Sequence, residues 1–325
     1  MAVKCLVREH VTLAQREVRL LKDADDHPNV IRYFFHEVKA SFLCIALALC
    51  PASLADIIER PAHSDQFRKI ADTFNCKRAV REITSGLGHL HSLRIVHRDI
   101  KPSNILISSV KEGESSGHRM LISDFGLCRE LEFGETSYSP TVSGAIGAGT
   151  CGWKAPEILR REVRGDEAIT DDNVRTTIGI GMQTRLTNSV DIFALGCLHY
   201  YCLTTGGHPF GNRHERDYNI WHGRVSLQRL EGLGEDGPEA VDLITSMLAP
   251  EAANRWANPE FSFELVLTQA LIHKDLMRRS VSCIPTSGPP VGDWNSYKTL
   301  RIVLRPCVAT SRILFSLNWK ATLSI

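Results

Sequence analysis

The amino-acid sequence predicts an α+β fold with a small β-rich N-terminal part and a larger, mainly helical C-terminal part. The chain has 325 residues, which at roughly 150 residues per domain corresponds to about two domains or lobes. Short apolar runs typical of strands occur before residue 50, whereas apolar residues recur with helical spacing from about residue 52 onward. The change of pattern therefore predicts a boundary near residue 50.

Composition excludes several classes of protein. The 38 Lys and Arg residues are balanced by 37 Asp and Glu residues, so the net charge of +1 argues against a polybasic protein that binds nucleic acid or membrane surfaces. The longest apolar candidate, residues 42–49, is far shorter than the ~20 residues of a membrane-spanning helix. The ten cysteines are scattered without a C-x-x-C motif, which favours a reduced, cytosolic chain over a disulfide scaffold or a zinc site.

The N-terminal part alternates between strand and helix patterns. Residues 1–7 form a short apolar run that predicts a strand, and apolar residues at helical spacing within 11–21 predict a helix. His27-Pro28-Asn29 ends that helix. The apolar runs 30–35 and 42–49 predict two further strands, which together make a small α+β unit.

The C-terminal part contains three strong helix patterns. Residues 76–90 carry one apolar face of a long amphipathic helix, and residues 190–203 are apolar nearly all round, which is typical of a buried helix. Residues 238–248 predict another helix that begins at a proline. Polar composition predicts loops or surface insertions at 111–118, 134–152 and 160–185.

Three motifs follow one another in the centre of the chain. The sequence reads His97-Arg98-Asp99-Ile100-Lys101-Pro102-Ser103-Asn104, then Ser123-Asp124-Phe125-Gly126, then Ala155-Pro156-Glu157. Their order, and the 25 positions from Asp99 to Asp124, resemble the catalytic loop, the metal-binding motif and the end of the activation segment of eukaryotic protein kinases. A chance polar loop would not reproduce all three. The resemblance implies the bilobal protein-kinase fold.

The resemblance also implies a chemistry, because phosphoryl transfer requires positioning and charge neutralisation more than covalent catalysis. Asp99 would orient the substrate hydroxyl and accept its proton. Lys101 would hold the γ-phosphate of ATP, and a lysine here is typical of serine/threonine kinases. Asn104 and Asp124 would bind Mg²⁺.

Two upstream residues complete the phosphate site that the resemblance implies. Val3-Lys4 resembles the kinase strand whose lysine contacts the α- and β-phosphates, and Glu17, thirteen residues later, would be its ion-pair partner. An isolated Lys and Glu are more often both solvated. The downstream motifs favour the functional interpretation.

The adenine site and two structural pairs are implied in the same way. Leu47 would be the gatekeeper, and backbone groups of Ala48 and Cys50 would bind the adenine edge, although a plain core strand would also account for these apolar side chains. Asp191 would brace the backbone of the catalytic loop. Arg255 would pair with Glu157, since a buried charge requires a partner.

Four longer stretches narrow the resemblance: residues 16–34, 123–131, 149–159 and 189–211. Together they resemble the inositol-requiring endoplasmic-reticulum stress sensors, which are kinase/endoribonucleases of the unfolded protein response, and the fungal forms in particular. The family implies a homodimer that binds ATP or ADP and autophosphorylates at the cytosolic face of the endoplasmic reticulum. Ser137 and Ser139 are favoured as phosphoacceptors among the hydroxyl residues Thr136, Ser137, Ser139, Thr141 and Ser143.

The chain also departs from the family, as if truncated at both ends. It begins at the strand of Lys4, so we expect residues 1–50 to form a partial N-lobe that lacks the glycine-rich loop, and 51–279 to form the C-lobe. Residues 280–325 are expected to be a linker and an unassigned tail. His273 and Tyr297 do not make a recognisable ribonuclease set, so neither RNA binding nor RNA cleavage is expected of this chain.

Two functions remain open from the sequence. The first is a serine/threonine kinase that uses ATP and Mg²⁺ and is expected to phosphorylate itself, as its intact motif residues favour. The alternative is a catalytically impaired kinase-fold module for dimerisation and nucleotide sensing, which the missing glycine-rich loop favours. A ribonuclease is the least supported, because it requires an appended module.

Overall fold

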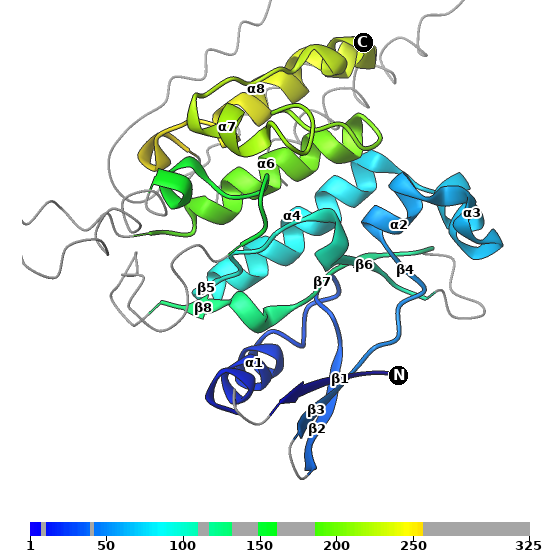
Figure 1. The fold of residues 1–325 in the computed structure, drawn as a ribbon. Coiled ribbons are helices and arrows are strands. Elements are labelled where there is room, and N and C mark those ends of the chain that lie inside the picture. Colours follow the sequence, from blue (N-terminus) through cyan, green and yellow to red (C-terminus); the bar gives the residue numbers. More distant parts are fainter. Residues whose placement is uncertain (8–10, 40–41, 110–116, 132–148, 161–185, 256–325) are drawn as a thin grey trace, which may run out of the picture. The chain divides into compact units, whose positions relative to one another are not determined.

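The computed structural model describes six ranges of the chain (Figure 1): residues 1–7, 11–39, 42–109, 117–131, 149–160 and 186–255. All of them belong to one compact unit, Met1–Asp275. The second unit, Leu276–Ile325, lies outside the described residues.

The N-terminal sheet has three antiparallel strands, β1 (Ala2–Val7), β2 (Tyr33–Lys39) and β3 (Phe42–Leu47), in the order β1-β3-β2. Helix α1 (Val11–Asp23) contacts all three strands and lies beside the sheet in Figure 1. The central strand β3 contributes the buried Leu43 and Ile45 to the core. The sheet and the helix thus bring β1, which carries Lys4, close to α1, which carries Glu17.

One strand differs from the sequence prediction. The run 30–35 predicted a strand, but β2 begins only at Tyr33. Val30 and Ile31 are buried instead, at 3% and 0% exposure. The backbone N–H of Ile31 donates to the carbonyl of Ile122 at 2.9 Å, so a long-range contact takes these apolar residues out of the N-terminal sheet.

The C-terminal part is mainly helical. Helix α4 (Cys76–Ser92) is capped by Asn75, whose side chain accepts a hydrogen bond from the N–H of Arg78. Helix α6 (Ser189–Leu203) is buried on nearly every side, as its sequence predicts. Further helices in the described residues include α2 (Leu54–Glu59), α3 (Asp65–Asp72), α7 (Arg216–Trp221) and α8 (Gly237–Met247), with 3₁₀ turns at Pro61–His63, Pro102–Asn104, Phe125–Leu127, Gln228–Asp236 and Ala252–Asn254.

Two small sheets in this part were not predicted. Strands β4 (Ala52–Ser53), β6 (Ile105–Ile107) and β7 (Met120–Ile122) form one, and β5 (Ile95–Val96) pairs with β8 (Arg129–Glu130) in the other. Strands of two or three residues are too short to show a period in the sequence. They fix the points at which residues 97–104 and 123–126 leave the scaffold.

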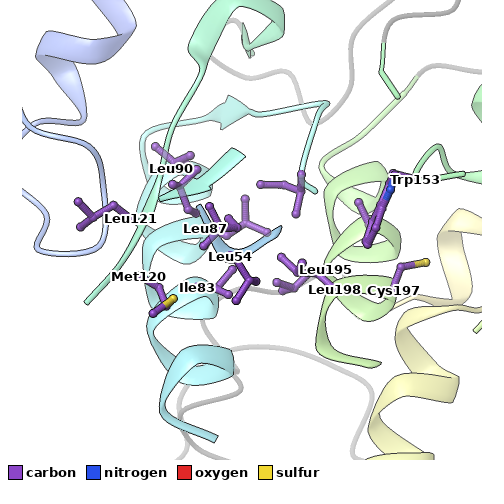
Figure 2. Close-up of a cluster of buried hydrophobic side chains, with 14 of the residues drawn as sticks. Leu54, Ile83, Leu87, Leu90, Met120, Leu121, Trp153, Leu195, Cys197 and Leu198 are labelled. Carbon is purple, nitrogen blue, oxygen red and sulfur yellow. The ribbon is translucent and has the colours of Figure 1, made fainter. Parts of the chain in front are cut away.

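The hydrophobic core joins α4 to α6. Figure 2 shows Ile83 and Leu87 of α4 beside Leu195 and Leu198 of α6, with Leu54 of α2 near them. These side chains are 0–2% exposed. Burial of a Leu or Ile side chain contributes about 1.5–3 kcal/mol, so this contact holds α6 firmly against α4, the helix that precedes the loop 97–104.

Within the described ranges, no helix is both long enough and apolar enough to cross a lipid bilayer.

Candidate active site

The loop after β5 is held by a buried carboxylate. Asp191, at the start of α6, is 1% exposed and accepts hydrogen bonds from the backbone N–H groups of His97 and Arg98, both at 2.7 Å, and from His91 Nε2 at 2.9 Å. Arg98 adopts a left-handed backbone with φ 71°, which is costly for a side chain with a Cβ. Asp191 therefore braces the loop, as its sequence position predicts.

Charge keeps Asp191 ionised. Burial by itself would raise the pKa of Asp191, but the hydrogen bond and charge of His91 and the N–H of Arg98 outweigh it, so the pKa is lowered. An ionised carboxylate accepts stronger hydrogen bonds than a neutral one. The brace consequently persists at neutral pH.

His97 joins the two polar motifs. The ring is 0% exposed, and Nε2 lies 3.0 Å from the carbonyl oxygen of Ser123, the residue before Asp124. The ring also meets the edge of Phe125, with 5.8 Å between centroids. His97 thus couples the position of Asp99 to that of Asp124.

Asp99 lies at the centre of a hydrogen-bond network that also includes the side chains of Lys101, Asn104 and Thr150. Asp99 Oδ2 accepts hydrogen bonds from Lys101 Nζ at 2.6 Å and from Asn104 Nδ2 at 2.9 Å. Asp99 Oδ1 accepts from Thr150 Oγ1 at 2.7 Å, and Thr150 Oγ1 in turn accepts from Lys101 Nζ at 2.5 Å. The carboxylate is 7% exposed and is held at both oxygens, so its direction is set before any substrate arrives.

Thr150 is the residue that sequence reasoning missed. It follows Gly149 in the stretch 149–159, which is one of the four stretches that carry the family resemblance. Thr150 is the one hydroxyl residue of that stretch, but the neighbouring residues give no sign that it contacts Asp99. Its role depends on the fold, which brings it 51 positions back along the chain to Asp99.

Lys4 meets two carboxylates. Lys4 Nζ lies 2.7 Å from Glu17 Oε1 and 2.8 Å from Asp124 Oδ1. The Glu17 side chain is 4% exposed, whereas those of Lys4 and Asp124 are 33% and 49% exposed. Lys4, Glu17 and Asp124 belong to β1, α1 and the segment after β7. The ammonium group of Lys4 therefore lies where these three elements meet.

Their pKa values follow from burial and mutual attraction. Burial would lower the pKa of Lys4, but attraction to Glu17 and hydrogen bonds to both carboxylates raise it. Burial would raise the pKa of Asp124, but the hydrogen bond and charge of Lys4 lower it. For Glu17 burial dominates and raises the pKa, since Lys4 offsets only part of the desolvation. Asp124 is thus the more exposed anion that a cationic ligand would meet.

Asp124 and Asn104 carry the kinds of oxygen ligand that a divalent cation would use. Asp124 has a left-handed backbone with φ 64°, which turns its carboxylate back toward the N–H of Gly126 at 3.4 Å. A Cβ on Gly126 would lie in ordinary van der Waals contact with this cluster, 3.4 Å from Asp124 Oδ1 and 3.8 Å from Lys4 Nζ. Asn104 Nδ2 donates to the carbonyl and carboxylate oxygens of Asp99. The amide oxygen of Asn104, Oδ1, therefore points away from Asp99. Carboxylate and amide oxygens are the ligands that Mg²⁺ prefers.

In the segment after β3, one of the two backbone groups of Ala48 is already hydrogen-bonded within the protein. The N–H of Ala48 already donates to the carbonyl of Arg32 at 2.9 Å, so only the carbonyl of Ala48 remains for a ligand. Cys50 Sγ lies 3.9 Å from that carbonyl. Leu47 and Cys50 are partly buried against the core, and burial raises the pKa of the Cys50 thiol to about 11. The sequence predicted that backbone groups of Ala48 bind the adenine edge. Because the N–H of Ala48 is already used, we expect its carbonyl oxygen to make that contact.

Comparison with known proteins agrees with this geometry. Residues 1–274 match the protein kinase domain family. The chain belongs to the protein kinase family. Together with its helices and small antiparallel sheets, the match confirms the predicted α+β kinase fold.

This kinase domain has relatives among the kinase/endoribonucleases. It is 42% identical over 277 residues to serine/threonine-protein kinase/endoribonuclease IRE1 of Hypocrea jecorina, with 80% of this chain and 22% of that protein covered. It is 43% identical over 265 residues to ireA of Aspergillus fumigatus, with coverage of 79% and 22%. It is 40% identical over 256 residues to the sensor for unfolded proteins in the ER ire1 of Schizosaccharomyces pombe, with coverage of 78% and 23%. The predicted resemblance is confirmed, and the chain spans less than a quarter of each relative.

The Glu157–Arg255 pair of this kinase domain is present as predicted. Arg255 Nη1 and Nη2 donate to the two carboxylate oxygens of Glu157 at 2.7 and 2.8 Å, and Nε donates to the carbonyl of Ala249 at 2.7 Å. The guanidinium also lies over the ring of Phe193, 5.1 Å from its centroid. The side chain of Arg255 is 0% exposed, and this pair connects the segment around Glu157 to the segment that follows α8.

Several predicted residues of this kinase lie outside the described residues. They are the hydroxyl residues of segment 136–143, together with His273 and Tyr297.

Proposed function

We propose that the chain is a serine/threonine protein kinase that transfers the γ-phosphate of ATP to a Ser or Thr hydroxyl. The observation that carries the proposal is the network in which Lys101, Asn104 and Thr150 hold both carboxylate oxygens of Asp99. A carboxylate oriented in this way can accept the proton of an incoming hydroxyl. The serine/threonine kinase names of the relatives support the substrate class.

Each residue has a distinct task in this proposal. Asp99 orients the substrate hydroxyl and takes up its proton, while Lys101, next to Asp99, neutralises the transferred phosphate. Lys4, held by Glu17, contacts the α- and β-phosphates. Asn104 and Asp124 hold Mg²⁺, which when bound neutralises charge on the phosphate oxygens. Leu47, Ala48 and Cys50 line the adenine site.

The biological setting forms part of the proposal. One relative is named a sensor for unfolded proteins in the ER, which supports a role in unfolded-protein-response signalling at the cytosolic face of the endoplasmic reticulum. We propose that the chain forms a homodimer and phosphorylates its own segment 136–143. The five Ser and Thr residues within that short segment support this substrate.

A second candidate is a module that binds nucleotide without transferring phosphate. The observation that favours it is that Lys4, Glu17 and Asp124 bond directly to one another, whereas Asp99 and Thr150 bond to each other in a second cluster that is linked to the first through Ser123. A chain can therefore bind a nucleotide through the first network while the second stays idle.

Two measurements on the purified chain separate the candidates. Mg·ATP binding is measured by calorimetry, and phosphate incorporation is followed with labelled ATP and phosphopeptide mapping. We expect Asp99→Asn to lower incorporation by about 10²-fold or more while nucleotide still binds, and Asp124→Asn to weaken Mg-dependent binding. Glu251→Gln, at an exposed ion pair, is the matched control.

Each outcome decides between the proposals. Incorporation that is unchanged in Asp99→Asn would contradict the kinase assignment. Tight Mg·ATP binding without any incorporation by the parent chain would support the nucleotide-binding module instead.

A further inference from the structure

Two cysteines face each other across the N-terminal sheet. Cys5 of β1 pairs directly with Cys44 of β3 in an unbroken antiparallel register, with Lys4 opposite Ile45 on one side and Leu6 opposite Leu43 on the other. The Cα atoms of directly opposed residues lie about 4.5–5.5 Å apart, which is within the range that a disulfide spans. Cys5 Sγ lies 2.7 Å from Cys44 Sγ, so the side chains already point at one another.

The cysteine pair lies on the face of the sheet that is turned away from Lys4. Neighbouring residues of a strand point to opposite faces, and β1 alternates regularly between partly buried and exposed residues. Val3, Cys5 and Val7 form the exposed set, whereas Lys4 belongs to the other. A small oxidant in solvent can therefore reach Cys5 without entering the nucleotide site.

Three other cysteines of the described residues are less suited to oxidation. Cys128, Cys197 and Cys202 are buried, and desolvation raises the pKa of each thiol. Since the thiolate is the reactive form, such thiols are inert. The hydrogen bond with Cys5 raises the pKa of Cys44, so Cys44 retains its proton and the exposed Cys5 is the thiol that an oxidant meets first.

We propose that Cys5 and Cys44 form a reversible disulfide that joins β1 to β3, with hydrogen peroxide as the oxidant. The Cys5 thiolate attacks one peroxide oxygen, the O–O bond breaks, and hydroxide leaves, which converts Cys5 to a sulfenic acid. The Cys44 sulfur then attacks the Cys5 sulfur, the S–O bond breaks, and the leaving hydroxide takes up the Cys44 proton as water. Overall two thiols lose two electrons and two protons, and one peroxide becomes two water molecules.

A dithiol reductant reverses the step. Its thiolate attacks one sulfur of the disulfide, forms a mixed disulfide, and a second attack by the other thiol of the reductant releases both cysteines as thiols. The proposal rests on the register and the contact between the two sulfurs, so it stands or fails independently of the kinase assignment.

The disulfide would change stability more than nucleotide affinity. It connects positions 39 residues apart, and closing a loop of that length restricts the unfolded chain. The link is on the face opposite Lys4, so the contacts of Lys4 with Glu17 and Asp124 are not displaced. We expect the oxidised chain to show a higher Tm and an unchanged affinity for Mg·ATP.

The test uses peptide mapping of the full chain. The purified protein is treated with hydrogen peroxide, remaining thiols are alkylated, and the chain is digested with trypsin without reduction. Cys5 is released in peptide 5–8, and Cys44 in peptide 40–68, since Arg60 precedes a proline and resists cleavage. The expected product is a cross-link of these two peptides that has lost two hydrogen atoms and disappears on treatment with a dithiol.

Peptide 40–68 also contains Cys50, so variants assign the bond. The link should disappear in Cys5→Ser and in Cys44→Ser but persist in Cys50→Ser, with the Tm of each reduced variant measured to show that it folds. The rise in Tm on oxidation should be absent in both of the first two variants. A link that persists in Cys44→Ser, or full alkylation of Cys5 and Cys44 after peroxide treatment, would overturn the proposal.

Discussion

Lys4 Nζ lies 2.7 Å from Glu17 Oε1 and thereby joins strand β1 to helix α1. Because Glu17 is 4% exposed, its carboxylate has few alternatives to this partner. The same ammonium group reaches Asp124 at 2.8 Å. The position of the Lys4 ammonium group therefore depends on how α1 packs against the sheet.

Removing the charge of Glu17 should impair catalysis more than folding. In Glu17→Gln the ammonium group of Lys4 loses its buried anion and is held by Asp124 alone, so it no longer points reliably at the phosphates. A displacement of about 1 Å can cost as much as 10²-fold in rate, and we expect kcat/KM for ATP to fall by about 10-fold or more. Steady-state kinetics measures this change. The control is Glu37→Gln, which removes one partner of an exposed ion pair in β2. Equal kcat/KM values for the two variants would contradict the assignment of Glu17 as the residue that positions Lys4.

The hydroxyl of Thr150 should matter, and its methyl group should not. Thr150→Val keeps the shape but removes the group that donates to Asp99 and accepts from Lys101. We expect kcat to fall by about 10- to 100-fold, with a Tm close to that of the parent. Thr150→Ser restores the hydroxyl and should recover most of the activity. If the Val and Ser variants have the same kcat, Thr150 does not position Asp99.

Breaking the Glu157–Arg255 pair should destabilise the fold. Glu157→Gln leaves the guanidinium of Arg255, which is 0% exposed, without its counter-charge, and the loss of one partner of a buried pair costs about 3–5 kcal/mol. Urea unfolding measures this change. Glu251→Gln breaks the exposed pair with Arg160 and should cost less than about 1 kcal/mol, so similar losses in the two variants would refute the prediction.

Acid should destabilise the chain through two buried histidines. Burial lowers the pKa of His199 and of His208 from 6.5 to about 3. Both stay neutral in the folded state, while the unfolded state takes up protons below pH 6.5, so stability is fully present above that pH and falls as the pH drops toward 3. Between pH 6.5 and 5 each histidine should contribute a loss of about 2 kcal/mol.

Unfolding at several pH values checks this dependence with two variants. His199→Gln keeps a polar atom near Thr84, which lies 3.0 Å from His199 Nε2, and His208→Asn keeps an acceptor for the N–H of Phe210. Each should flatten the slope of stability against pH between 6.5 and 5, even if it lowers stability at pH 7. An unchanged slope in both variants would show that other groups control the acid response.

Local sequence was sufficient for the elements that have a long, regular pattern. The helices α4 and α6 follow from apolar residues at helical spacing, and the order of the three motifs predicts the kinase fold. The pairing of Lys4 with Glu17 also follows from motif positions. Short strands such as β5 and β8 could not be predicted from local sequence. Two residues are too few to show an alternating pattern, and the strands pair only when the rest of the fold brings them together.

The sequence by itself determined the kinase family and the residue types available for its chemistry, since these depend on motifs of contiguous residues. Only the tertiary structure decided which groups meet. Thr150 reaches Asp99 across 51 positions and Cys5 meets Cys44 across 39, while Val30 and Ile31 leave the predicted strand to contact Ile122. Such contacts arise from packing between distant segments, and the free energy of packing depends on the partner surface, which no local pattern of residues contains.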